Sequence, residues 1–80
     1  MHEARAVAEV VRAAETVAAG RRLTRLGIRV EGDEHVTAEI VRTHVAALTA
    51  RTHPGLQVRV DVDPSAAEPA IRLVSISVEE

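Results

Sequence analysis

Residues 56–63 read Leu56-Gln57-Val58-Arg59-Val60-Asp61-Val62-Asp63, and this stretch decides the fold. Apolar side chains alternate strictly with polar ones, which is typical of a β-strand with one buried face. A second alternating stretch, from residue 23 to 30 or 31, predicts another strand. Its apolar face holds Leu26, Ile28 and Val30. A third strand is predicted from residue 71 to 78, where the alternation changes phase near Val74 and Ser75. That change predicts either a bulge or burial of both faces.

Two amphipathic helices are predicted on either side of the 23–31 strand. The first runs from about residue 3 to 19 and ends at Gly20, a favourable left-handed residue after a last turn. The second begins after Thr37, a good N-cap residue, and is followed by the helix-breaking segment 53–55, which contains Pro and Gly. The first helix has the predicted buried stripe Val7, Val10, Val11, Ala14, Val17 and Ala18, and the second has Ile40, Val41, Val45 and Leu48.

The order of these elements, αβαββ, predicts a single α+β domain over residues 1–80. A β-α-β connection is right-handed and makes its two strands parallel, and the third strand then returns antiparallel. Both helices should therefore cover one face of a three-stranded mixed sheet. The other face should present Arg25, Arg29, Gln57, Arg59 and Asp61 to water or to a partner.

Composition narrows the possible functions. The net charge of −2 and the absence of Phe, Tyr and Trp argue against nucleic-acid binding, because there is neither a basic footprint nor a stacking platform. The absence of cysteine excludes disulfides, thiolate catalysis and cysteine-bound zinc. No catalytic motif is visible, so we expect no enzyme. We also expect no membrane association and a cytoplasmic location, since neither a membrane span nor a signal-peptide pattern is present. The thin, non-aromatic core makes a homodimer a reasonable expectation.

The first three residues, Met1-His2-Glu3, form a candidate metal site. If Met1 is retained, its α-amine, the amide nitrogens of His2 and Glu3 and the His2 imidazole can close around one ion. Four nitrogens in a plane suit Ni(II) or Cu(II). The other histidines lack a ligand partner at a suitable spacing. His35 is either a weak metal site with its acidic neighbours or part of a solvated turn, which we favour. His44 is interpreted as a packing or interface residue, and His53 as a loop residue.

The chain also resembles a known family over nearly its whole length. Several segments, taken in order, are similar in pattern to the nickel-insertion metallochaperones of NiFe-hydrogenase maturation, the HypA/HybF family. These segments are Met1-His2-Glu3, the helix after it, the basic approach Arg22-Leu23-Thr24-Arg25-Leu26, the alternating stretch 49–63 and the terminal strand Ile71-Arg72-Leu73-Val74-Ser75-Ile76-Ser77-Val78. Members of that family carry a zinc module with two Cys-x-x-Cys pairs between the last two strands. Here only the loop 64–70 occupies that place, so no zinc site is expected.

The resemblance implies a carrier that hands Ni(II) to a hydrogenase large-subunit precursor, together with a maturation GTPase. Its metal site transfers to Met1, His2 and Glu3 alone. An alternative function is a metal-free interaction module of the same fold that docks on the GTPase or on a hydrogenase subunit. A domain that binds RNA or a small ligand has little support from the charge balance and the missing aromatic residues.

Overall fold

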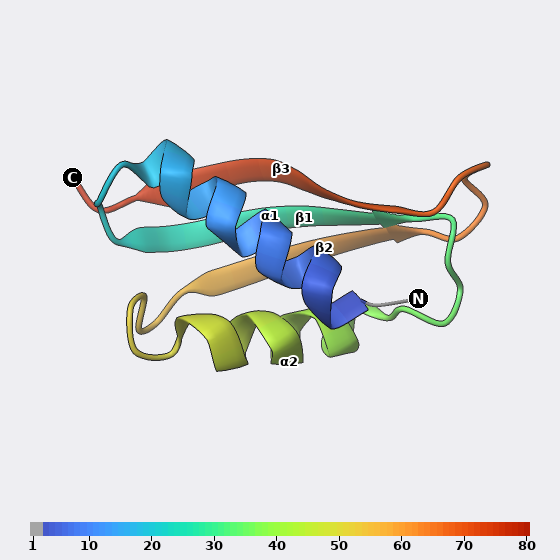
Figure 1. Ribbon diagram of the computed structural model, residues 1–80, viewed down its shortest axis with the longest axis horizontal. Helices are drawn as coiled ribbons and strands as arrows, with labels where there is room; N and C mark the ends of the chain where they lie inside the picture. Colours follow the sequence, from blue (N-terminus) through green and yellow to red (C-terminus); the bar gives the residue numbers. More distant parts are fainter. Residues whose placement is uncertain (1–2) are drawn as a thin grey trace.

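The computed structural model describes residues 3–80 and contains every predicted element (Figure 1). The elements are α1 (Glu3–Ala18), β1 (Leu23–Glu31), α2 (Ala38–Thr49), β2 (Gln57–Asp63) and β3 (Ala70–Val78). Strand β1 is central; it pairs in parallel with β2 and antiparallel with β3. Both helices pack on one face of this mixed sheet, so the predicted α+β fold is confirmed.

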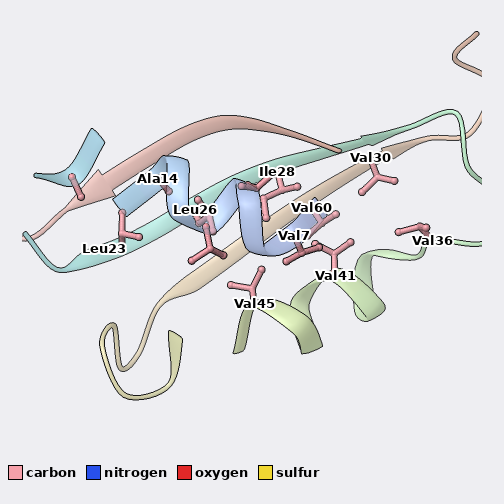
Figure 2. Close-up of a cluster of buried hydrophobic side chains, with 13 residues drawn as sticks. Val7, Ala14, Leu23, Leu26, Ile28, Val30, Val36, Val41, Val45 and Val60 are labelled. Carbon is pink, nitrogen blue, oxygen red and sulfur yellow. The ribbon is translucent and has the colours of Figure 1, made fainter. Parts of the chain in front are cut away.

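The core lies between the helices and the sheet and is built from small aliphatic side chains. Central strand β1 is buried most completely: Leu23, Leu26, Ile28 and Val30 are each at most 1% exposed. Figure 2 shows side chains from both helices and from β2 gathering over this strand. The predicted inward face of β1 is therefore confirmed.

The predicted helical stripes are wrong at Val17 and at Leu48, although Ala18 is buried as predicted. Val17 is 65% exposed and Leu48 is 48% exposed. Figure 1 shows why: α1 crosses the sheet diagonally and ends over the edge strand β3, while α2 lies along the other edge strand, β2. A helix over an edge strand has no neighbour on its outer flank, so an apolar residue there faces water. Val62 of edge strand β2 is also exposed.

The phase change in β3 is a bulge, which is the first of the two predicted alternatives. Gly27 of β1 pairs with Ser75, and the next residue, Ile28, pairs with Leu73, so Val74 has no partner in the ladder. Val74 is 60% exposed. The extra residue allows the apolar side chains on both sides of the bulge to point into the core.

Local chemistry fixes the turns that connect the elements. Thr37 caps α2, because its Oγ1 accepts a hydrogen bond of 3.2 Å from the Ile40 amide. α1 ends at Ala18, one residue earlier than predicted, and Ala19 and Gly20 then have φ values of 53° and 87°; the left-handed Gly20 was predicted, whereas the left-handed Ala19 was not. The β2–β3 connection is one residue shorter than the predicted loop 64–70, because Ala70 already pairs with Glu31. Within residues 3–80, neither helix has the length and apolar character to cross a lipid bilayer.

Candidate metal centre

The predicted ligands lie at the very start of the chain. Met1 and His2 are outside the residues that the structure describes, and Glu3 is the first residue of α1. The first four N–H groups of an α-helix have no acceptor within the helix, and they point along its axis away from the body of the helix. The Glu3 amide is thus one of these groups, and the helix does not use the nitrogen that the predicted site requires.

The first turn of α1 is held by the core that follows it. Val7, one turn after Glu3, is fully buried, and Figure 2 shows it beside Val41 of α2. Glu3 itself is only half-buried, and its carboxylate lies at the positive end of the helix dipole, where it is stabilising. α1 is therefore packed into the core within about one turn of Glu3.

Elsewhere in residues 3–80, no group of three or more His, Cys, Asp or Glu side chains is arranged to hold a metal ion. The side chain of His35 is 89% exposed, and its Nε2 lies 4.0 Å from a Glu34 carboxylate oxygen. The Asp33 carboxylate accepts a hydrogen bond of 2.8 Å from the His35 amide, which closes a tight turn. His44 is half-buried on α2 and lines a shallow hollow beside Thr37 and Ile40.

His53 is the histidine whose role sequence reasoning missed. It lies in the α2–β2 loop, as predicted, but it is only 7% exposed. Its Nδ1 accepts a hydrogen bond of 2.9 Å from the buried Leu23 amide, and its Nε2 lies 2.9 Å from Glu15 Oε2. One imidazole therefore connects α1, the first residue of β1 and the loop before β2.

These two contacts determine the tautomer of His53. Because Nδ1 accepts from the Leu23 amide, the ring proton is on Nε2, which donates it to the Glu15 carboxylate. Both ring nitrogens are occupied, so neither offers a free lone pair to a metal ion or to a substrate proton. His53 is a structural residue, and the partners that show this are 30 and 38 residues away in the chain.

The sheet face away from the helices carries a chain of charges that extends across all three strands. Glu31 accepts hydrogen bonds from Arg72 at 2.7 Å and from Arg29 at 3.1 Å, and Arg29 also contacts Asp63 at 3.3 Å. The Arg72 contact, followed by the Arg29 contact, holds the pKa of Glu31 below its ordinary value of 4.5. Hydrogen bonds from Ser65, with help from Arg29, lower the pKa of Asp63 in the same way.

Comparison of the chain with family models, with curated proteins and with solved structures gave no match. The function must therefore be argued from the residues themselves. Two observations bear on a metal centre. The sequence places four nitrogen donors at Met1-His2-Glu3, and the Glu3 amide lies at the N-terminus of α1.

Proposed function

We propose that the protein is a Ni(II)-binding, metallochaperone-like accessory protein in the maturation of a NiFe-hydrogenase or a related metalloenzyme. Its cargo is held by Met1, His2 and Glu3. The observation that carries the proposal is the donor set: one amine, two amides and one imidazole lie within three residues. The resemblance of the whole chain to the HypA/HybF pattern supplies the direction of transfer, from this protein to a hydrogenase large-subunit precursor with a maturation GTPase.

The chemistry of this donor set favours Ni(II) or Cu(II), which accept four nitrogens in a plane. Binding releases protons from the amine, whose reference pKa is about 7.7–8.0, and from the amides. Affinity should therefore fall as the pH is lowered. By the Irving–Williams order, Cu(II) binds the isolated site at least as well as Ni(II), so selectivity for nickel comes from metal supply and from partners.

The helix after the site supports a transfer role. Because α1 begins at Glu3 and is anchored in the core from Val7 onward, Glu3, the one predicted ligand within residues 3–80, lies at the end of a packed helix. We infer that a metal ion bound at this helix end is accessible to a receiving site on another protein. A chaperone requires such access, whereas a structural metal site is normally closed.

The alternative is a metal-free interaction module that docks on the maturation GTPase or on a hydrogenase subunit. One observation favours it. Within residues 3–80, β2 and β3 each pair only with β1, so each has an outer edge without a strand partner. Such an edge can add a strand from another chain, including a second copy of this protein.

A metal-binding comparison separates the two functions. The protein is prepared without a tag and with a free Met1 amine, which intact mass verifies, and Ni(II) binding is measured by equilibrium dialysis. The test variant is His2→Ala. The control is His35→Ala, which removes a highly exposed imidazole elsewhere. We expect one Ni(II) per chain in the native and control proteins and a large loss with His2→Ala. Equal binding by all three proteins, or no binding by any, would overturn the proposal.

A further inference from the structure

A shallow hollow of about 550 Å³ lies on the sheet face away from the helices. It is lined by Arg25, Gly27, Gln57, Arg59, Ser75 and Ser77. The hollow exists because Gly27, on the central strand between Arg59 and Ser75, has no side chain. A Cβ atom at Gly27 would lie 2.5 Å from the Ser75 hydroxyl oxygen. The floor of the hollow is therefore the Gly27 backbone with the Ser75 hydroxyl beside it.

The charges on this face are distributed unevenly. At the far end, Arg29 and Arg72 are engaged by the carboxylates of Glu31 and Asp63. At the hollow, Arg25 makes no ion pair with any residue in 3–80. The side chain of Arg59 is 84% exposed, and its nearest ionic contact, with Asp61, is a loose 3.6 Å. No carboxylate lines the hollow, so it is locally positive although the whole chain has a net charge of −2.

The strand register brings hydrogen-bond donors from all three strands to the same place. Arg25 lies between Gln57 and Ser77 in one row of the sheet, and Arg59 lies opposite Gly27 in the next row. Parallel strands lie about 4.8 Å apart and rise about 3.3 Å per residue, so the backbone positions of Arg25 and Arg59 are about 8 Å apart, which long side chains span easily. Two guanidinium groups can thus converge over the glycine, flanked by one amide and two hydroxyl groups.

We propose that this hollow binds the phosphate group of a small phosphate monoester. Guanidinium groups bind phosphate bidentately, and a tetrahedral oxyanion has enough acceptor oxygens for two of them and for the serine hydroxyls. The volume is within the range of small-molecule sites and exceeds what a bare phosphate ion fills, so space is left for the group that it esterifies. The site is on the opposite side of the sheet from α1 and does not depend on nickel.

The test is an amide NMR titration at constant ionic strength, with glycerol 3-phosphate and inorganic phosphate as the two probes. The test variant is the double substitution Arg25→Gln with Arg59→Gln. The matched control is Arg29→Gln with Arg72→Gln, which removes the same charge from the same face. All four side chains are solvent-exposed, so both variants should retain the native amide spectrum.

We expect saturable shifts at Gly27, Ser75 and Ser77, with glycerol 3-phosphate binding more tightly than inorganic phosphate. The test variant should bind about tenfold more weakly or worse, and the control should change by less than about threefold. Equal weakening in the two variants, or shifts that do not saturate, would overturn the site. Equal affinity for the two probes would overturn the monoester as its ligand.

Discussion

His53 offers a sharp test of how the two loops at one end of the sheet are held. Its two ring nitrogens can be removed one at a time. In His53→Asn, the side-chain oxygen occupies nearly the place of Nδ1 and can still accept from the Leu23 amide. In His53→Gln, the longer side chain reaches the place of Nε2 and contacts Glu15, while the Leu23 amide loses its acceptor.

Loss of each hydrogen bond should lower the free energy of unfolding by a different amount, because the two partners of His53 are buried to different extents. Leu23 is completely buried, so an unpaired amide there costs about 1–3 kcal/mol. The side chain of Glu15 is 43% exposed, so water replaces its lost hydrogen bond and the cost is about 1 kcal/mol or less. His53→Asn should therefore be about 1–2 kcal/mol more stable than His53→Gln. In a domain of this size, that corresponds to about 4–16 °C in Tm.

The assay is thermal and urea unfolding followed by far-ultraviolet circular dichroism, because the chain has no Trp or Tyr for fluorescence. Glu15→Gln is the control for the Nε2 side, since the new carbonyl oxygen can accept the same proton; we expect it to cost under about 1 kcal/mol. A His53→Gln protein as stable as His53→Asn would refute the assignment of Nδ1 as the acceptor for Leu23.

Three further predictions follow from burial, backbone geometry and charge. In urea unfolding, Val45→Ala should cost about 2–3 kcal/mol because its side chain is completely buried, whereas Val17→Ala should change stability by less than about 0.5 kcal/mol; similar losses would contradict the assigned core. Gly32 and Gly55 both have a positive φ, so alanine costs about 1–2 kcal/mol at either, but at Gly32 the new Cβ would also lie 2.5 Å from a backbone carbonyl oxygen. Gly32→Ala should therefore lower the urea midpoint further than Gly55→Ala, and the reverse order would contradict this contact. The stabilisation from Glu31 should be fully present above pH 4.5 and should be lost as the pH falls through its lowered folded pKa; a carboxyl NMR titration midpoint at or above 4.5 would contradict its pairing with arginine.

The fold could be predicted from sequence because its signals are local. A residue in a strand alternates with its own neighbours, so the order of side chains predicted the inward face of β1 and a phase change near Val74, for which a bulge was one of two alternatives. The polar outer face of the sheet followed from the same alternation. Exposure of Val17 and Leu48 could not be predicted in this way, since it depends on which helix end overhangs an edge strand.

The candidate sites differ in the same way: a site built from consecutive residues can be predicted from sequence, and a site built from distant residues cannot. Met1-His2-Glu3 is visible in sequence because its donors are consecutive, and the structure adds the helix that begins at Glu3. The role of His53 depends on partners far along the chain, and no local pattern indicates them. The hollow at Gly27 depends on cross-strand register, which also brings Arg72 to Glu31 and Arg29 to Asp63, whereas Arg25 has no ion pair within residues 3–80.

The most direct measurement of the central claim is the visible absorption spectrum during Ni(II) addition to protein with a free Met1 amine. A planar four-nitrogen site should produce a d–d band that grows until one Ni(II) is bound per chain and weakens as the pH is lowered. The band should be absent from the His2→Ala protein. A native protein without the band, or the same band in both proteins, would contradict nickel binding at Met1-His2-Glu3.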